Sequence, residues 1–273
     1  MSTFDVYGMT DKLAPTILDV IATRLEARGN YPIFQQMMHD YLDAMEIDTA
    51  QNVLDLGCGT GVATRGIVGR AAFSGGVTGI DLSSHLVEAA RQLSDQEGKG
   101  AQVVFQVGDS RNLDLPDAGF DAVVAHTLLS HVDDPLAVLK EAARLVKPGG
   151  MVGVYDGDYA SITFSHEDPA KGQAYEAAIQ RAVITNPRVM RQMPRLLRQA
   201  GLEIVTSFSY ILAEMGKADF WVSALESLRR LVPQSGVMTS EEINQWVDGR
   251  LQESEDDVFF GASNYYGYVA KRP

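Results

Sequence analysis

The sequence predicts an α/β fold in which a parallel sheet is covered by helices on both faces. From residue 52 onward, short apolar runs alternate with amphipathic segments, a rhythm typical of strand–helix–strand units. Helical patterns lie at about 62–72, 84–97 and 135–146. The strands expected between them are Asn52–Leu56, Val77–Asp81, Val103–Val107, Phe120–Ala125 and Met151–Tyr155.

Two amphipathic helices are expected ahead of the sheet. Apolar residues recur there at helical spacing, and the segment RGNYP interrupts the pattern. The recurring residues are Leu13, Ile17, Val20, Ile21 and Leu25, then Phe34, Met37, Met38, Tyr41, Leu42 and Met45. We expect residues 1–50 to form a helical lid over the sheet edge where ligands bind in open α/β folds.

Residues 51–273 are expected to form the main domain, with helical insertions at about 156–187 and 213–258. The first insertion reads as loops and a helix around 171–184. The segment RVMRQMPRLLRQAGL predicts a helix that ends at Gly201, and 203–212 reads as a strand. Helical patterns at about 217–232 and 239–253 precede an aromatic C-terminal strand, SNYYGYVAKR.

Composition limits the classes of partner. The net charge of −13 disfavours nucleic acid and anionic membranes, because an acidic surface repels phosphate groups. Cys58 is the single cysteine, so no disulfide framework can form. The segment MSTFDVYGMTDK lacks the basic and apolar parts of a signal peptide, and no apolar run is long enough to cross a membrane. We therefore expect a cytoplasmic protein without membrane insertion.

Three glycines follow the first strand in NVLDLGCGTG, at Gly57, Gly59 and Gly61. A strand that ends in this pattern and opens a helix indicates a tight turn and the close approach of a ligand, with a plain turn as the alternative. A dinucleotide fingerprint would place its third glycine at position 62, which is Val62. The turn also has no basic residue to meet a pyrophosphate. These features disfavour an NAD(P)-dependent reductase.

Polar residues end the next two strands. The segment VTGIDLS ends its strand in Asp81, where an acidic side chain accepts hydrogen bonds from both ribose hydroxyls; a helix N-cap is the alternative role. The segment FQVGDSRNLDLP places Asp109 and Ser110 beside the same pocket. Asp109 can accept a hydrogen bond from the adenine amino group, or serve as a turn residue. Together these signals predict one nucleoside site.

The segments VLDLGCGTG, GIDLS, GDSRNLDLP and FDAVVAHTLLSHVDDPLAVLKEAARLVKPGG together resemble class I S-adenosylmethionine-dependent methyltransferases. Within that group the chain is similar to the ubiquinone/menaquinone C-methyltransferase-like small-molecule subfamily. The resemblance is specific over roughly 50–155 and extends over 188–273. It implies a Rossmann-like sheet of seven strands, mostly parallel, whose last strand is antiparallel and inserted between the fifth and sixth.

The resemblance implies S-adenosyl-L-methionine as cofactor, released as S-adenosyl-L-homocysteine. Asp55 and the loop Gly57–Gly61, with Cys58, would meet its methionine part, and His126 would lie near the sulfonium. Asp81 would hold the ribose, Leu82 would pack on the adenine, and Asp109 and Ser110 would contact the adenine edge. Arg24 is a candidate for the cofactor's carboxylate, with a solvated surface position as the alternative. No metal is expected, since no H-E-x-x-H motif or Cys/His cluster occurs.

A sulfonium is already an activated leaving group, so such an enzyme mainly aligns the acceptor and excludes water. The candidates for an assisting general base are His126, His131 and Asp158, each with a structural role as the alternative. Aromatic and methionine side chains could line an apolar acceptor chamber, although some of them will be plain core. These are Tyr7, Phe34, Met37, Met38, Trp221, Phe259, Phe260, Tyr265 and Tyr266.

The sequence therefore predicts an S-adenosylmethionine-dependent methyltransferase that acts on a small-molecule acceptor, with O-, N- and C-methylation all open. One alternative is a protein that binds the same cofactor but catalyses a different reaction, such as cyclisation or decarboxylation. A second is a non-catalytic binding module, and a third, less favoured, is an NAD(P)-dependent reductase. A homodimer is a possible assembly.

Overall fold

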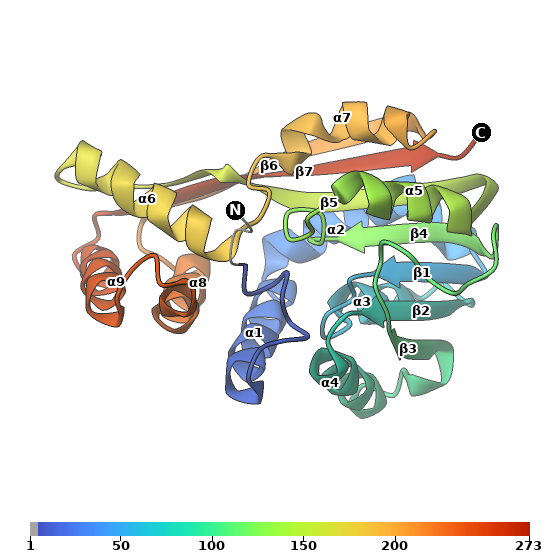
Figure 1. The fold of residues 1–273 in the computed structure, drawn as a ribbon, viewed down its shortest axis with the longest axis horizontal. Coiled ribbons are helices and arrows are strands. Elements are labelled where there is room, and N and C mark those ends of the chain that lie inside the picture. The colour runs from blue at the N-terminus through green and yellow to red at the C-terminus, as the bar shows by residue number, and fades with distance from the viewer. Residues whose placement is uncertain (1–4) are drawn as a thin grey trace.

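The computed structural model describes residues 5–273, which form one sheet of seven strands in the order β3-β2-β1-β4-β5-β7-β6 (Figure 1). Strand β7 runs antiparallel to both of its neighbours, and the other adjacent pairs are parallel. The last strand thus lies between the fifth and the sixth, and the expected fold is confirmed. The strands are β1 (Asn52–Leu56), β2 (Gly76–Asp81), β3 (Val103–Val107), β4 (Phe120–His126), β5 (Val146–Phe164), β6 (Glu203–Gly216) and β7 (Phe259–Lys271).

Local signals mark where many of the helices begin. Four of them, α1, α2, α5 and α6, carry proline in the first turn, where its fixed φ suits a helix and its missing N–H costs nothing. Asp134 and Asp168 cap α5 and α6, and Thr239 forms a capping box with Glu242 at α9. The helices are α1 (Pro15–Gly29), α2 (Pro32–Ala44), α3 (Val62–Val68), α4 (Ser84–Gln96), α5 (Pro135–Leu145), α6 (Pro169–Val183), α7 (Val189–Gln199), α8 (Phe220–Leu231) and α9 (Ser240–Glu255).

The sheet divides the hydrophobic core into two parts. Leu54 and Val123 pack beneath α5 and α7, while Val53 and Val124 belong to the cluster that contains α2. Successive strand residues point to opposite faces, so strands covered on both sides must be apolar at consecutive positions. This requirement explains the unbroken apolar runs of β1 and β4, and it leaves the polar side chains at the strand ends.

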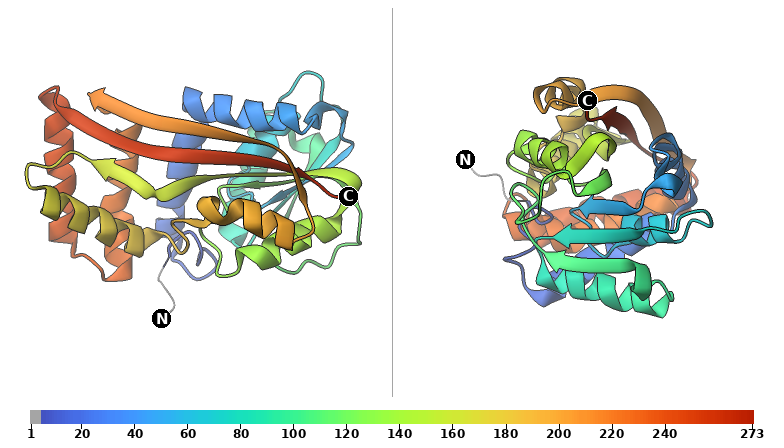
Figure 2. Two further views of the ribbon diagram at one scale, coloured as in Figure 1. Left: turned by 90° about the horizontal axis from the view of Figure 1, so that it is seen from above. Right: turned by 90° about the vertical axis from the view of Figure 1, so that its right-hand side faces the viewer.

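Strand β5 is longer than expected, because residues 156–164 continue it instead of forming a loop. They pair with β7 as far as Phe164 opposite Gly261, with an irregularity between Asp158 and Thr163. The sequence suggested a loop here because Asp156 is a charged residue. In the structure Asp156 is buried within the strand, and Ser130 donates hydrogen bonds to its carboxylate in place of solvent. The long strands β5, β6 and β7 run past the rest of the sheet and carry α6, α8 and α9 (Figure 2).

The two N-terminal helices have different surroundings. Helix α2 buries Phe34, Met37 and Tyr41 in the main core, against β5, β6 and β7. Helix α1 packs instead on α3, α4 and α8, beyond the carboxyl ends of the parallel strands. Residues 5–14 precede it along the same edge. The division of the chain at residue 50 into lid and domain stays a prediction.

We predict that Met37→Ala lowers the free energy of unfolding by about 2–5 kcal/mol, because it leaves a cavity in the core. Met37 is fully buried, and its sulfur accepts a hydrogen bond from the Tyr155 hydroxyl at 2.7 Å, which the variant also loses. Urea denaturation measures the change. Gln35→Ala, at an exposed position of the same helix, is the matched control and should stay within about 0.5 kcal/mol. Equal stability of the two variants would contradict a core role for α2.

Candidate active site

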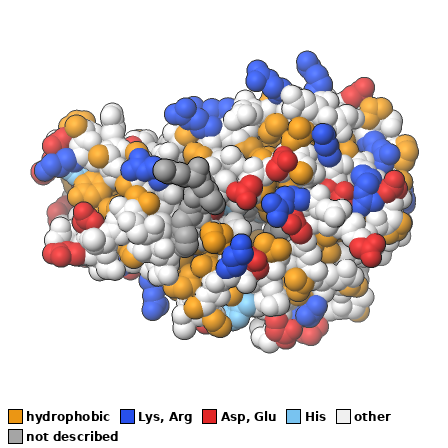
Figure 3. Space-filling view, in the orientation of Figure 1, with side chains coloured by type: hydrophobic (Ala, Val, Ile, Leu, Met, Phe, Trp, Pro, Cys, Tyr) orange, Lys and Arg blue, Asp and Glu red, His pale blue; other side chains and the backbone are white. Residues whose placement is uncertain are grey.

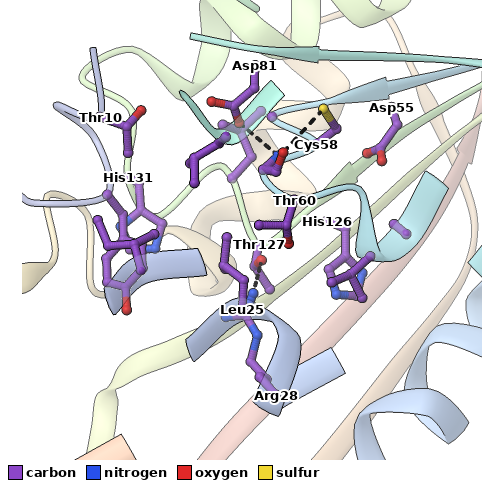
Figure 4. A pocket seen from close by; sticks show the side chains of 18 residues that line it. Thr10, Leu25, Arg28, Asp55, Cys58, Thr60, Asp81, His126, Thr127 and His131 are labelled. Carbon is purple, nitrogen blue, oxygen red and sulfur yellow. Dashed lines mark hydrogen bonds between the residues drawn. The ribbon is translucent and has the colours of Figure 1, made fainter. Parts of the chain in front are cut away.

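Two adjoining cavities lie at the carboxyl edge of the parallel strands. We call the first the glycine-loop cleft; it is bounded by Asp55, the loop Gly57–Thr60, Asp81, His126 and Thr127, and it is covered by Leu25 and Arg28 of α1 (Figure 4). The cleft continues into an open groove beside Asp81, Leu82, Asp109 and Ser110. The structure thus brings most of the expected cofactor residues to one continuous site.

The glycines of the loop serve the turn and its packing. Gly57, Gly59 and Gly61 have φ of +67°, +53° and +82°, in the left-handed region that favours glycine. A Cβ at Gly59 would lie 2.9 Å from Leu25 Cδ1 of α1. Gly57 and Gly59 line the cleft, whereas Gly61 faces the ring of Phe105 and lines neither cavity. The close approach at Gly61 is therefore between β3 and the start of α3.

Asp55 presents an unpaired carboxylate oxygen at the inner end of the cleft. The side chain is fully buried, and its Oδ2 accepts a hydrogen bond from the Thr64 hydroxyl at 2.6 Å. Its Oδ1, like the buried hydroxyl of Thr60, has no hydrogen-bond partner within residues 5–273. Burial raises the pKa of Asp55 to about 7. Buried polar atoms normally have partners, so two unpaired ones beside a cavity indicate a polar ligand.

Asp81 ties the glycine loop to the end of β2. Its carboxylate accepts the backbone N–H of Gly59 at 2.8 Å and that of Ser83 at 2.9 Å, and burial raises its pKa. The N-cap of α4 is Ser83, so the alternative role suggested for Asp81 is filled by another residue. Each carboxylate oxygen keeps a second lone pair, and Asp81 lies where the cleft meets the groove.

The outer groove carries the remaining expected contacts. Asp109 forms an ion pair with Arg111, with 2.6 Å between Oδ2 and Nη2. The hydrogen bonds that Arg111 donates lower the pKa of Asp109. Ser110 and Leu82 line the groove beside it. Cys58 lines the cleft, and its side chain packs in a small cluster with Val87 and Ala90. An adenine contact at Asp109 would use the lone pairs that Arg111 leaves free.

His126 is held as a neutral ring. Its Nδ1 lies 3.0 Å from the hydroxyl of Tyr41, and the ring stacks on Tyr155 with 4.8 Å between centroids. Burial, with a smaller effect of the Arg28 charge, lowers its pKa to about 3. Tyr41 donates in this contact when the ring proton resides on Nε2 and accepts when it resides on Nδ1. With so low a pKa, His126 stays neutral near pH 7 and is a poor proton acceptor in the cleft.

His131 forms a buried dyad with Asp5. Its Nδ1 lies 3.1 Å from Asp5 Oδ2, and Asp5 also accepts the backbone N–H of Tyr7, Gly8 and Thr185. Burial lowers the pKa of His131, but the charge and hydrogen bond of Asp5, together with the charge of Asp156, outweigh it and leave the pKa above its ordinary value. With Nδ1–H donating to Asp5, Nε2 keeps its lone pair, and no hydrogen bond engages it within the described residues. His131 lines both the cleft and the second cavity.

Asp158 is separated from these groups. It is 1% exposed and forms a double hydrogen bond with Arg191 of α7, with 2.8 Å between Oδ2 and Nη2. It lines neither the cleft nor the second cavity. Among the three candidate bases, the structure therefore brings His126 and His131 to the cleft and leaves Asp158 in an ion pair.

The second cavity, the apolar chamber, lies between α1, α6, α8 and the long half of β5. Its lining residues surround about 820 Å³ of empty space, part of which is open to solvent. It shares Tyr7, Leu25, Arg28 and His131 with the cleft, so the two cavities adjoin. Of the aromatic and methionine residues expected to line a chamber, Tyr7, Trp221 and Tyr265 do so. Phe34, Met37, Met38 and Phe259 are core residues, and Phe260 and Tyr266 are partly exposed.

Two arginines of α1 face these cavities. Arg24 lines the chamber and not the cleft; its Nη1 donates to the Ser223 hydroxyl at 3.3 Å, and its guanidinium lies 4.5 Å from the ring centroid of Phe220. Arg28 lines both cavities and donates to Thr127 Oγ1 at 2.7 Å. Sequence reasoning missed Arg28, although the i,i+4 spacing in RLEAR places it on the face of Arg24. It also missed Asp5, whose segment has no periodic pattern.

Comparisons with known proteins relate the chain to methyltransferases. Residues 54–154 match the methyltransferase domain family. A sterol 24-C-methyltransferase of Yarrowia lipolytica is 38% identical over 133 residues, which are 47% of this chain and 34% of that enzyme. The chain belongs to the class I S-adenosylmethionine-dependent methyltransferases. The match thus spans about a third of the length of the sterol enzyme and about half of the present methyltransferase.

Two further proteins resemble this methyltransferase over nearly its whole length. A 37.1 kDa protein in transposon TN4556 of Streptomyces fradiae is 29% identical over 256 residues, 93% of this chain and 70% of that protein. The crystal structure of the 4+2 cyclase SpnF superposes with a TM-score of 0.66 and 18% identity, covering 99% of this chain and 97% of that one. The latter likeness shows a shared fold.

Two features are absent from residues 5–273. No helix in this part of the methyltransferase is long and apolar enough to cross a membrane. Within the same residues, no group of three or more His, Cys, Asp or Glu side chains is arranged to hold a metal ion.

We predict that Asp5→Asn lowers the pKa of His131 by about 1 or more, because the carboxylate that favours the charged imidazole is removed. A titration followed by NMR of the histidine ring signals measures it. Asp11→Asn, which removes the same charge from an exposed position of the same segment, should leave the value unchanged. An unaltered pKa in the Asp5 variant would show that the dyad does not form in solution.

Proposed function

We propose that this methyltransferase transfers a methyl group from S-adenosyl-L-methionine to a small molecule held in the apolar chamber. The observation that carries the proposal is the buried, unpaired oxygen of Asp55 beside a left-handed glycine turn, in a cleft that opens directly into the chamber. Such an arrangement suits a polar cofactor on one side and an apolar acceptor on the other.

The residues of the cleft fit the chemical groups of this cofactor. Asp55 Oδ1 fits an ammonium group, and the Arg28 guanidinium, which has no carboxylate partner among the described residues, fits the cofactor's carboxylate. The lone pairs left on Asp81 fit ribose hydroxyls, and the groove at Leu82, Asp109 and Ser110 fits an adenine. When bound, the cofactor supplies an electrophilic methyl group, whose bond to sulfur breaks with the electron pair left on sulfur as its bond to the acceptor forms.

We assign the general base to His131, with Asp5 as its positioning residue. The Nε2 lone pair is free to take the proton of an acceptor hydroxyl, amine or carbon acid, and the raised pKa suits proton transfer near neutral pH. Because the pKa of His126 is lowered to about 3, we propose that this neutral ring binds and orients the ligand. Asp158, neutralised by Arg191, is not assigned a catalytic role. The acceptor atom, oxygen, nitrogen or carbon, stays open.

We further propose that the enzyme acts without a metal, in the cytoplasm, on a small molecule rather than a nucleic acid. The net charge of −13 supports the exclusion of nucleic acid, because phosphate backbones are repelled by an acidic surface. The single buried cysteine is compatible with a reducing compartment. A homodimer remains a proposal that analytical ultracentrifugation can test.

Calorimetry is expected to show binding of S-adenosylhomocysteine and no binding of NADH or NADPH. Gly59→Ala should weaken S-adenosylhomocysteine about tenfold or more, because its Cβ crowds Leu25 at the cleft. The matched control is Gly98→Ala, which is equally left-handed, at φ +71°, but exposed with open space around it. Binding of NADH in place of S-adenosylhomocysteine would refute the proposal. Conversion of an acceptor without consumption of S-adenosylmethionine would favour a non-methylation reaction.

The affinity for S-adenosylhomocysteine should rise from pH 5 to about 7 and then level off. Asp55 has a pKa of about 7 in the unliganded protein, so below that pH it is mostly protonated. The positive amino group of the ligand favours the charged carboxylate, and binding therefore releases a proton. The expected slope is about tenfold per pH unit below 7. The Asp55→Asn variant should bind S-adenosylhomocysteine weakly and without this slope. The comparison shows whether the pH dependence comes from Asp55 or from the nearby His131. An equal slope in that variant would contradict the assignment.

A further inference from the structure

We propose that the acceptor carries a carboxylate, and that Arg24 binds this carboxylate inside the apolar chamber. The inference rests on the proposed function, because it names the class of substrate for the same site. It replaces the contact between Arg24 and the cofactor that the sequence suggested.

The lining of the chamber is cationic although the protein is acidic. Arg24 and Arg28 line it, and no aspartate or glutamate does so within the described residues. The whole chain has a net charge of −13. On the outer face shown in Figure 3, acidic and basic side chains are interspersed instead. A cavity of this sign inside an acidic protein favours an anionic ligand over a neutral or cationic one.

Neither arginine has a counter-ion within residues 5–273. In the described part of the chain, the polar contact of Arg24 is the Ser223 hydroxyl and that of Arg28 is the Thr127 hydroxyl. The two guanidinium groups belong to successive turns of α1, so they also repel each other. Both side chains are partly buried. An unpaired charge that has lost part of its contact with water is stabilised when an anion binds beside it. The arrangement therefore suits two anions, one for each arginine.

The two arginines differ in place. Arg28 lines the cleft and donates a hydrogen bond to the Thr127 hydroxyl there. The backbone of Thr127 has an uncommon φ of +55°. The cofactor's own carboxylate suits this position. Arg24 lies one turn earlier and stacks on Phe220. It lines the chamber and an open outer pocket beside Glu226, but not the cleft. The second anion therefore belongs to the molecule in the chamber, which is the acceptor.

The surroundings of Arg24 favour a carboxylate on an apolar body. A planar guanidinium matches a carboxylate with two parallel hydrogen bonds. The hydroxyl of Tyr159, which has no hydrogen-bond partner within residues 5–273, can donate a further one from the chamber wall. The rest of the wall is mainly apolar, from Phe164, Ile179 and Trp221 among others. The substrate class is therefore an aliphatic or aromatic carboxylic acid.

The test compares acids with their neutral amides on the protein saturated with S-adenosylhomocysteine. The probes are phenylbutyrate against phenylbutyramide and decanoate against decanamide, titrated by calorimetry and by tryptophan fluorescence, to which Trp221 of the chamber wall and Trp246 of α9 both contribute. Wild type should bind each acid about tenfold or more tightly than its amide. Arg24→Gln should bind acid and amide equally and keep its affinity for S-adenosylhomocysteine, and Arg24→Lys should keep part of the preference.

The matched control is Arg181→Gln, which removes the same charge from an exposed position of α6 and should keep the wild-type preference. Equal or undetectable binding of both members of each pair, with S-adenosylhomocysteine bound, overturns this inference and leaves the proposed function standing. Loss of S-adenosylhomocysteine binding by Arg24→Gln, with the acid preference kept, returns Arg24 to the cofactor. Wild type that binds no S-adenosylhomocysteine overturns the proposed function as well. If Arg24→Gln does not fold, the wild-type comparison decides alone.

Discussion

Antiparallel pairing of β7 with β5 and β6 is the interaction on which the site depends. β7 pairs with β5 from Met151 opposite Lys271 to Phe164 opposite Gly261, and with β6 along its whole length. This pairing keeps β5 in the sheet well beyond the ends of β1, β2 and β4. The extended half provides the surface on which α6, α8 and α9 pack, and α6, α8 and β5 enclose the chamber. Without it, the cleft would face solvent where it now adjoins an apolar cavity.

The cleft itself is built from polar groups that are unfavourable to bury. Asp55 and Asp81 have pKa values raised by burial, and Thr127 holds a left-handed backbone conformation. Unpaired buried oxygens and backbone strain lower stability, and they persist where the surrounding core enforces them. Here the enforcing elements are the strands themselves, because both aspartates sit at the ends of β1 and β2. The ligand that supplies the missing partners should therefore stabilise the fold as it binds.

The wall shared by the two cavities links their occupancy. Tyr7, Leu25, Arg28 and His131 line both, and the first three belong to α1 or the segment before it. A ligand in the cleft that fixes Arg28 and Leu25 also fixes one side of the chamber. The acceptor then meets a preformed wall, which reduces the entropy lost when it binds. His131, held by Asp5 from the same N-terminal segment, is placed by the same contacts.

Much of the fold and of the cleft was determined by the sequence alone. The strand–helix rhythm, the glycine turn after β1 and the polar residues that end β2 and β3 are local signals, and parallel strands bring their ends to one edge by geometry. The tertiary structure alone decided the rest. Asp5 contacts His131, which lies more than a hundred residues away in the sequence. Arg28 of α1 donates a hydrogen bond to Thr127, which follows β4. The length of β5 depends on its pairing with β7. Burial, not residue type, keeps His126 neutral. The packing of α1 places Arg24 at the chamber and not at the cleft. Periodicity reports which face of a helix or strand is apolar, whereas pairing between distant segments and the burial of charge depend on the completed packing.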